Sequence, residues 1–238
     1  MNILILMAGS EKGFSEKGYP KCLIETQNKP MIQRTIELLD SVGSNITCII
    51  RKEDQNNYFL GDTLKILCPK CKIIEIPGNT KGAVCSALFA IDEINNDEEL
   101  LILNGSQLIK TDIKPAIESF RARNLNAGIV TINAVHPKYS SILLDENNLV
   151  VQTSEKRPIS NIASTGCCYF KKGSDFVESA FSVIEKDVNT QGQYYISATF
   201  NEMILNNRKI GIFEIPKKDY LTFSNYQMYE RYLETRNK

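Results

Sequence analysis

Hydrophobic residues fall into two alternating patterns along the first half of the chain. Short, mostly apolar runs predict buried strands at residues 3–6, 46–50, 71–76 and 100–103. Between these runs, apolar residues recur every three or four positions and predict helices at residues 30–42, 54–67 and 80–94. Strands and helices in alternation are typical of an α/β fold in which right-handed crossovers join parallel strands.

The pattern changes after about residue 124. Strands are predicted at residues 127–134, 140–145, 149–154, 166–170 and 210–215, and helices at 174–186, 197–207 and 224–236. The segment from Asp145 to Asn148 predicts a hairpin turn between two of these strands. No internal repeat or linker separates the two halves, so we expect residues 1–238 to form a single α/β domain in which the second half decorates the first.

The size and charge of the chain limit what it can bind. A chain of 238 residues is long enough to bury a full core. Its 28 Lys and Arg residues balance 28 Asp and Glu residues, so no net field favours nucleic acid or an anionic membrane surface. No apolar run approaches the ~20 residues of a membrane span, and the short opening run lacks the basic flank of a signal peptide. We therefore expect a cytoplasmic protein that binds neither nucleic acid nor membrane.

Seven cysteines, an odd number, predict free thiols in a chain of cytoplasmic character. Cys68 and Cys71 are the one spaced pair, and such a pair is compatible with half of a zinc site or with a redox centre. No second pair follows at ligand spacing, and His136 is the only histidine. Two thiols at a helix-to-strand turn are therefore the favoured interpretation, with the other two left open.

The first 32 residues carry the strongest functional signal. The first strand is followed by Ala8-Gly9, a polar loop at residues 10–19, the pair Pro20-Lys21 and a helix that begins at Pro30. This order predicts a nucleotide site at the carboxyl end of the first parallel strand. Small residues at positions 8 and 9 let a base or ribose approach the backbone, and Lys21 supplies a positive charge for a phosphate. The competing interpretation is a tight turn followed by a solvent-exposed lysine.

This opening block resembles the start of sugar-phosphate nucleotidyltransferases, and most closely a bacterial branch found with capsule and surface-polysaccharide genes. Shorter blocks extend the resemblance over most of the chain, in the order Asn79–Ala83, Leu101–Gln107, His136–Lys138, Ser154–Lys156 and Gly166–Phe170. The resemblance implies a three-layer, Rossmann-like α/β fold with a mixed, mainly parallel sheet. It also implies a reaction in which a sugar phosphate oxygen attacks the α-phosphorus of a nucleoside triphosphate and pyrophosphate leaves, with Mg²⁺ offsetting the charge.

The resemblance also assigns roles to residues in each half of the chain. The nucleotide would contact the first half, residues 1–124, at Leu6, Met7, Ala8, Gly9, Thr80, Gly82 and Asn104. The sugar would contact Gly105 and, within residues 125–238, Glu155, Lys156 and Gly166. Lys21 would lie beside the reacting phosphates, and Thr80 also has the side chain of a helix N-cap. A homo-oligomer is compatible with all of these assignments.

Three positions depart from the pattern of the family. Glu11 replaces a glycine of the phosphate loop, and Gly13 stands where an arginine clamps the triphosphate. Lys12 is next to that position and is the substitute we expect, although lysine lacks the bidentate fork of arginine. Ser106 replaces the strand-end aspartate that binds Mg²⁺, so this position keeps only a neutral hydroxyl and the metal is expected to bind weakly.

These departures leave more than one function open. Each lost charge contact to a transition state costs about 2.7–4 kcal/mol. We expect a sugar-1-phosphate nucleotidyltransferase of polysaccharide precursor synthesis that uses Lys21 and Lys12 in catalysis. The alternative is a catalytically degraded protein of the same fold that binds nucleotide or sugar phosphate as a regulator or partner subunit. A glycosyltransferase is disfavoured because the chain has no Asp-x-Asp motif.

Overall fold

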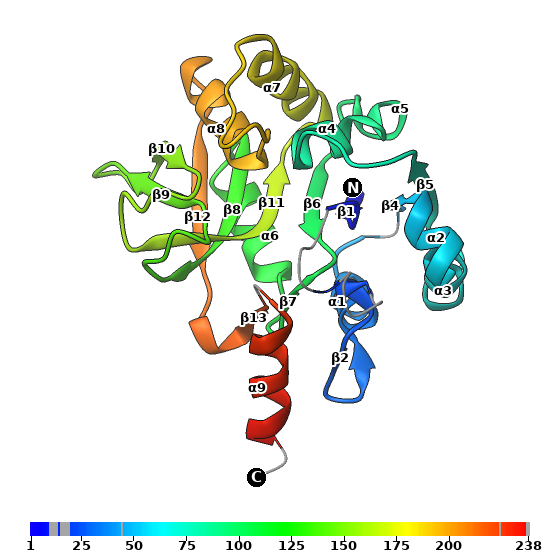
Figure 1. The fold of residues 1–238 in the computed structure, drawn as a ribbon. Coiled ribbons are helices and arrows are strands. Elements are labelled where there is room, and N and C mark those ends of the chain that lie inside the picture. Colours follow the sequence, from blue (N-terminus) through cyan, green and yellow to red (C-terminus); the bar gives the residue numbers. More distant parts are fainter. Residues whose placement is uncertain (10–13, 15–19, 44, 224, 237–238) are drawn as a thin grey trace.

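The computed structural model describes residues 1–9, 14, 20–43, 45–223 and 225–236 of the chain. In this part of the chain, nine strands form one mixed sheet, and helices cover both of its faces (Figure 1). The strand order is β10-β9-β11-β6-β1-β4-β5, and β8 pairs with both β11 and β12. The predicted α/β sandwich with a mixed, mainly parallel sheet is therefore confirmed.

The parallel half of the sheet consists of the four strands that the first apolar runs predict. They are β1 (Asn2–Leu6), β4 (Asn45–Arg51), β5 (Lys72–Ile76) and β6 (Leu100–Asn104). The segments between them contain α1 (Met31–Leu39), α2 (Lys52–Tyr58), α3 (Leu60–Leu67), α4 (Ala83–Leu88) and α5 (Ile91–Ile94). Leu6 lies opposite Ile49 of β4 and Asn104 of β6, so the carboxyl ends of these three strands meet at one edge of the sheet.

The second half of the chain extends the sheet with antiparallel strands. β11 (Ile162–Phe170) runs antiparallel to β6 and to β8 (Ala127–Asn133). β9 (Ser141–Leu144) and β10 (Val150–Ser154) form the predicted hairpin, while β12 (Ile210–Glu214) pairs in parallel with β8. The helices of this half are α6 (Lys114–Ala122), which precedes β8, α7 (Gly173–Glu185) and α8 (Ile196–Leu205).

Shorter elements complete the fold. β2 (Glu25–Thr26) pairs with β3 (Lys29–Pro30), β7 (Gln107–Ile109) pairs with β13 (Tyr220–Thr222), and two 3-10 helices span Lys21–Leu23 and Lys217–Asp219. The last helix, α9 (Tyr226–Arg236), projects from the body of the molecule (Figure 1). It is attached by an aromatic cluster that includes Phe14, Phe223 and Tyr229, and the Tyr229 hydroxyl donates a hydrogen bond to the Glu25 carbonyl oxygen at 3.0 Å.

Two hydrophobic cores lie on opposite faces of the sheet, because side chains alternate along each strand. In β1, Ile3 and Ile5 pack into the core that contains residues of α1, α3 and α6. Leu4 and Leu6 pack into the core that contains residues of α4, α7 and α8. All four side chains are buried, which explains why β1 is a continuous apolar run rather than an alternating one.

Several predicted elements differ in detail from those observed. The helix predicted at 54–67 is two helices, because Phe59 adopts a left-handed conformation with a φ of 52°. The helix predicted at 80–94 begins only at Ala83 and is interrupted after Leu88. Gly82 is its N-cap residue, so the prediction that Thr80 caps this helix is wrong. Likewise, α1 begins after Pro30 rather than at it.

The cysteines are free thiols, and the spaced pair lies at a turn. All seven are free thiols. Cys68 directly follows α3 and Cys71 directly precedes β5, so the spaced pair lies at the predicted helix-to-strand turn. Among the described residues, no group of three or more His, Cys, Asp or Glu side chains could hold a metal ion.

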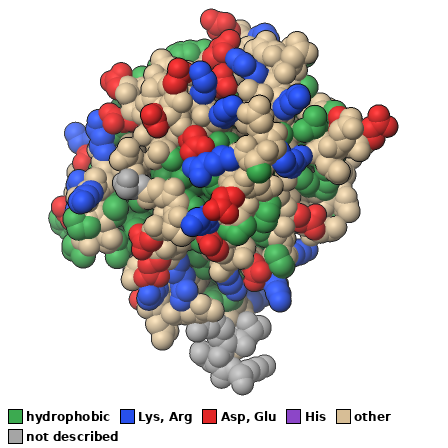
Figure 2. All heavy atoms as spheres, turned by 180° about the vertical axis from the view of Figure 1, so that it is seen from behind, with side chains coloured by type: hydrophobic (Ala, Val, Ile, Leu, Met, Phe, Trp, Pro, Cys, Tyr) green, Lys and Arg blue, Asp and Glu red, His purple; other side chains and the backbone are tan. Residues whose placement is uncertain are grey.

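The surface carries side chains of both charges, in line with the equal numbers of basic and acidic residues in the chain. On the face shown in Figure 2, positive and negative side chains are interspersed. Within the described ranges, no helix combines the length and the apolar character that are needed to cross a membrane.

Candidate functional site

The carboxyl ends of β1, β4 and β6 form the polar edge of the sheet. The Met7 amide donates to the Ile49 carbonyl oxygen at 2.9 Å, and the Gly105 amide donates to the Leu6 carbonyl oxygen at 3.0 Å. These bonds keep the three chain segments together for one residue beyond the regular strand pairing. Three of the cavities formed by the described residues lie along this edge, and we name each of them by the residues that define it.

The β1–α4 cavity has a volume of about 510 Å³ and lies between the end of β1 and the start of α4. It brings together every residue that the sequence analysis assigned to the nucleotide, namely Leu6, Met7, Ala8, Gly9, Thr80, Gly82 and Asn104. Lys156, Gln193 and Tyr195 from the second half of the chain complete its lining. Residues that are far apart in sequence thus converge on one space large enough for a nucleoside.

Backbone contacts with Tyr194 hold the segment that leads into α4. Gly82 has a φ of 112°, and a Cβ atom built there would lie 2.4 Å from the Tyr194 carbonyl oxygen. The Tyr194 amide donates to the Lys81 carbonyl oxygen at 2.7 Å, and the Val84 amide donates to the Tyr194 carbonyl oxygen at 3.1 Å. Packing against Tyr194 therefore requires a glycine here whether or not a ligand also approaches. The Thr80 hydroxyl is hydrogen-bonded to the Gly82 carbonyl oxygen at 3.1 Å and lies 2.7 Å from the Ser86 hydroxyl.

The Glu155 cavity has a volume of about 250 Å³ and adjoins the first cavity, because Leu6, Ala83, Asn104 and Tyr195 line both. Its other polar lining residues are Gln107, Lys138, Tyr139, Ser140, Thr153, Glu155, Ser164 and Ser197. Glu155 and Gly166, both assigned to the sugar from sequence, line this cavity. The cavity is therefore rich in the donors and acceptors that recognise a hydroxylated ligand.

Glu155 and Lys138 are the charged residues among those that line this cavity, and the Glu155 carboxylate is held by two hydroxyl groups. Its Oε2 accepts hydrogen bonds from the Ser140 hydroxyl and from the Ser197 hydroxyl, the latter at 3.0 Å. Burial raises the pKa of Glu155, and the two hydroxyl donors offset part of that rise. The serines hold the carboxylate in a fixed orientation, with further acceptor capacity for a ligand.

The other residues assigned to the sugar occupy three different positions. Gly166 has a φ of 82°, and a Cβ built there would lie 2.4 Å from Gln107 Oε1. Lys156 lines the β1–α4 cavity rather than the Glu155 cavity; its Nζ donates to Gln191 Oε1 at 2.8 Å and lies 5.2 Å from the centre of the Tyr195 ring. Gly105 is buried against the Met7 side chain and is not among the residues that line these three cavities.

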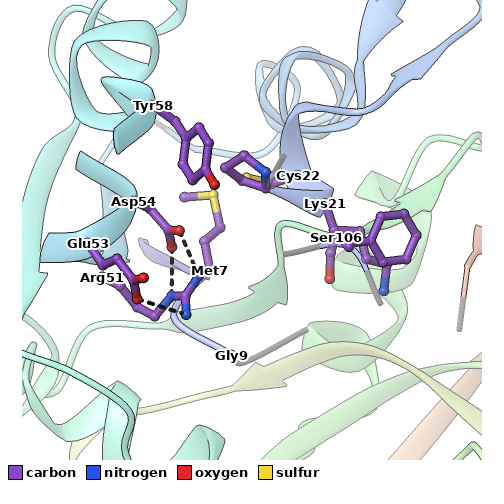
Figure 3. A pocket seen from close by; sticks show the side chains of 11 residues that line it. Met7, Gly9, Lys21, Cys22, Arg51, Glu53, Asp54, Tyr58 and Ser106 are labelled. Atoms are coloured by element: carbon purple, nitrogen blue, oxygen red, sulfur yellow. Dashed lines mark hydrogen bonds and ion pairs between the residues drawn. The ribbon is translucent and has the colours of Figure 1, made fainter. Parts of the chain in front are cut away.

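The Arg51 cavity, of about 90 Å³, lies on the β4 side of the edge and is shown in Figure 3. It is lined by Met7, Gly9, Phe14, Pro20, Lys21, Cys22, Arg51, Glu53, Asp54, Tyr58 and Ser106. Lys21 thus borders a cavity together with Gly9 and Ser106, and its Nζ lies 5.8 Å from the centre of the Phe14 ring. Among the described residues that line the cavity, the positively charged ones are Lys21 and Arg51, which come from different segments of the same edge.

Ser106 occupies the position at which the family aspartate was expected. It is 4 % exposed, and its hydroxyl and amide both donate to Asn104 Oδ1, at 2.8 and 3.1 Å. The oxygens of Ser106 and Asn104 are neutral, and the Asp54 carboxylate in the same cavity is paired with Arg51. The described residues therefore do not form a carboxylate site for Mg²⁺, and an ion here would depend on ligands that a phosphate and water supply.

Some predicted residues cannot be placed, and some site residues were not predicted. Lys12, the expected catalytic substitute, lies outside the described residues, as do Glu11 and Gly13. Ser140 and Ser197 were not predicted, because they come from separate elements and no spacing in the sequence connects them to Glu155. Arg51 had a usable signal: it ends a buried strand at the same edge as Gly9.

The chain is similar in sequence and in fold to known proteins. Residues 6–212 match the family model described as "Nucleotidyl transferase". The chain is 26 % identical over 220 residues to the bifunctional protein GlmU of Methanocaldococcus jannaschii, in an alignment that covers 89 % of this chain and 49 % of GlmU. The chain thus spans about half the length of that relative.

Two further relatives match over most of their own length. A ribitol-5-phosphate cytidylyltransferase of Streptococcus agalactiae is 22 % identical over 220 residues, covering 91 % of this chain and 87 % of that protein. The crystal structure of a nucleoside-diphosphate-sugar pyrophosphorylase from Vibrio cholerae superposes with a TM-score of 0.84 at 20 % identity, covering 98 % of this chain and 99 % of the other. At that identity, the structural similarity shows a shared fold.

Proposed function

Because this chain belongs to the nucleotidyl transferase family, we propose that it transfers a nucleotidyl group from a nucleoside triphosphate to a sugar 1-phosphate in polysaccharide precursor synthesis. The observation that carries this proposal is the convergence of seven residues, assigned from sequence to the nucleotide, on one cavity. That cavity adjoins a second one whose lining contains many polar side chains and the half-buried Glu155 carboxylate. Two adjoining cavities are what a reaction between two bound substrates requires.

The nucleotide is assigned to the β1–α4 cavity. The base lies against the backbone near Gly82 and Thr80, and the ribose lies close to Gly9, where no described atom is within 4 Å of a built Cβ. The phosphates then extend along the edge toward Lys21. In this arrangement residues 1–124 supply the nucleotide half, although Lys156 and Tyr195 of the second half close the cavity.

The acceptor is assigned to the Glu155 cavity, which residues 125–238 supply in large part. The Glu155 carboxylate accepts hydrogen bonds from hydroxyl groups of the acceptor, and the side-chain amide of Gln107 lies in the same lining. A hexose 1-phosphate and an alditol phosphate both present such hydroxyl groups. The name of one relative, a ribitol-5-phosphate cytidylyltransferase, makes ribitol 5-phosphate a reasonable second acceptor to test.

The chemistry follows from the charges. A phosphate oxygen of the acceptor attacks the α-phosphorus, the bond from that phosphorus to the bridging oxygen breaks, and pyrophosphate leaves with the electron pair. The attacking phosphate is already ionised, so no general base is needed. Lys21 offsets negative charge on the phosphates. Mg²⁺, which is expected with the triphosphate, would be held mainly by phosphate oxygens and water, with the Ser106 hydroxyl as a neutral protein ligand, and it would offset negative charge.

A pyrophosphate-release assay tests this function. Four nucleoside triphosphates with Mg²⁺ are combined in turn with a set of hexose 1-phosphates and with ribitol 5-phosphate. We expect one combination to release pyrophosphate, and Lys21→Met to lower kcat/KM by about 100- to 1,000-fold, the loss typical of one transition-state charge contact. The exposed Lys70→Met serves as the charge-matched control and leaves the rate unchanged.

A binding protein without turnover is the second candidate, and the absence of a carboxylate at Ser106 is the observation that favours it. Such a protein is stabilised against heat by a nucleoside triphosphate but releases no pyrophosphate. In that case Ser106→Asp combined with Gly13→Arg would restore measurable turnover. If no nucleotide and no sugar phosphate raises the Tm of the wild type, both candidates are wrong.

A further inference from the structure

The turn between α3 and β5 carries the spaced pair of cysteines, and the proposed function does not use it. The Cys71 amide donates to the Cys68 carbonyl oxygen at 3.0 Å, so residues 68–71 form a β-turn with Pro69 at its second position. Such a turn brings its first and last Cα atoms within about 7 Å of each other, which overlaps the range that a disulfide spans. The two cysteines can therefore be joined with little movement of the backbone.

The two thiols differ in their access to solvent. Cys68 is half-buried and packs at the margin of the core that contains residues of α3. Cys71 belongs to the same core and is only 1 % exposed. A reagent that approaches from solution therefore meets Cys68 first, and Cys71 is reached through Cys68.

The surroundings of Cys71 favour the thiolate, which is the reactive form of a cysteine. Lys65 Nζ donates to the Cys71 carbonyl oxygen at 2.5 Å, so a positive charge lies beside this residue. Hydrogen bonding with Cys48 and the charge of Lys65 lower the pKa of Cys71 to about 6, although burial opposes them. The protonated form has an acceptor in the Leu64 carbonyl oxygen, 3.8 Å from Sγ. At neutral pH most of Cys71 is nevertheless thiolate.

Cys48 also interacts with Cys71 but is poorly placed for a disulfide with it. In the register of β4 and β5, Cys48 lies opposite Ile73, two positions after Cys71. Residues on such a diagonal of adjacent strands lie roughly 7–8 Å apart, beyond the separation of about 7 Å that a disulfide tolerates. The hydrogen bond to Cys71 and burial raise the pKa of Cys48 well above its usual value. Cys48 is thus a hydrogen-bond donor to the Cys71 thiolate, and Cys68 is the partner that can be linked to it.

We propose that Cys68 and Cys71 form a thiol modification site, at which a small-molecule disulfide such as oxidised glutathione closes an intramolecular disulfide. The Cys68 thiolate attacks one sulfur of the reagent, and the first reagent thiolate leaves. The Cys71 thiolate then attacks Cys68 Sγ, and the second reagent thiolate leaves. The two protein thiols are oxidised, the reagent is reduced to two thiols, and these take up the protons that the protein thiols lose.

The order of the two steps follows from the two thiols. Burial and the charge of Cys71 raise the pKa of Cys68, so little of it is thiolate at neutral pH and the first step is slow. The second step joins two neighbours of one turn, and its attacking group is already ionised. The mixed disulfide on Cys68 therefore does not accumulate.

The modification site is separate from the candidate nucleotide site. Cys71 directly precedes the amino end of β5, which is parallel to β4. The three cavities lie at the opposite edge of the sheet, at the carboxyl ends of β1, β4 and β6. The inference therefore stands whether or not the proposed function is correct.

Oxidation of the folded protein followed by mass spectrometry tests this inference. The protein is incubated with oxidised glutathione at neutral pH, the remaining thiols are blocked at low pH, and trypsin digestion follows without reductant. We expect an intact mass lower by two hydrogen atoms before blocking. Cleavage after Lys65, Lys70 and Lys72 should release residues 66–70 linked to residues 71–72, and a reductant should separate the two peptides.

Serine variants check the order of the steps. Cys71→Ser should retain glutathione on Cys68 as a stable mixed disulfide, and Cys68→Ser should leave Cys71 unmodified. Cys85 is half-buried like Cys68 and lies outside the pair, so Cys85→Ser is the matched control and should form the same disulfide as wild type. The wild-type peptide map decides the matter even if a variant folds poorly. A stable mixed disulfide on wild-type Cys68, a link from Cys71 to Cys48, or no reaction at Cys68 would each overturn the inference.

Discussion

At the residue scale, Glu155 shows how burial and hydrogen bonding act on one carboxyl group in opposite directions. Burial is the larger effect and raises the pKa, while donors from Ser140 and Ser197 lower it in part. The pKa of the folded state is therefore above that of the unfolded chain. It follows that this group contributes stability that is fully present below its unfolded pKa and is lost as pH rises through its folded pKa.

Replacing the carboxyl group removes this pH dependence. We expect the free energy of unfolding of Glu155→Gln, relative to that of wild type, to increase as pH rises from about 4 to 7, across the pKa range of glutamate. Urea unfolding at several pH values checks the prediction. A stability difference that stays constant over this range would contradict it. The same variant should also raise the KM for the acceptor, since its acceptor capacity for hydroxyl groups is reduced.

At the scale of single elements, substitutions at the two glycines that line the β1–α4 cavity distinguish a role in packing from a role in nucleotide binding. Gly82→Ala places a methyl group against the Tyr194 backbone at a φ of 112°, so it should destabilise the fold by more than ~1 kcal/mol. Gly9→Ala meets no described atom within 4 Å, so its stability should stay within about 0.5 kcal/mol of wild type. Its methyl group should nevertheless weaken nucleotide binding.

Urea unfolding and nucleotide titration of the two variants provide the measurements. The pair also serves as its own control, because each substitution adds one methyl group to a residue that lines the same cavity. Loss of stability in Gly9→Ala, or an unchanged stability in Gly82→Ala, would show that the assignment of these two positions is wrong.

Elements were predictable from sequence where burial on both faces or one amphipathic stripe determined them. β1, β4, β6 and α7 are examples, and their bounds agree within a few residues. The break between α2 and α3 was not predictable. The left-handed residue at the break is Phe59, a residue type that does not favour this conformation, while Gly61 lies two residues later in the first turn of α3. The Gly61 amide donates to Gln55 Oε1 at 2.6 Å, a contact between the two helices that the sequence does not reveal. β7 and β13 were missed because short strands that pair across about half the chain leave no local pattern.

At the scale of the whole molecule, the part of the candidate site that lies at the carboxyl ends of strands could be predicted from the sequence. Ala8, Gly9 and Asn104 each come at or after the carboxyl end of a strand, so a parallel sheet brings them to one edge. The hydroxyl groups of Ser140 and Ser197 around Glu155 depend on how separate elements pack. The sequence identifies the edge, and the fold determines which side chains share it.

The two cores explain why this edge is stable enough to carry polar cavities. Apolar side chains from β1 enter both cores, and helices cover each face of the sheet. At the edge, the polar side chains of Lys21, Arg51 and Ser106 share a cavity lining with the buried residues Phe14 and Cys22.

The most direct test of the account is a crystal structure of the protein with a nucleoside triphosphate and Mg²⁺. The account predicts the nucleoside in the β1–α4 cavity, with its base against Gly82 and its ribose near Gly9, and the triphosphate directed toward Lys21. A nucleotide bound at any other surface, or one whose phosphates point away from Lys21, would contradict it.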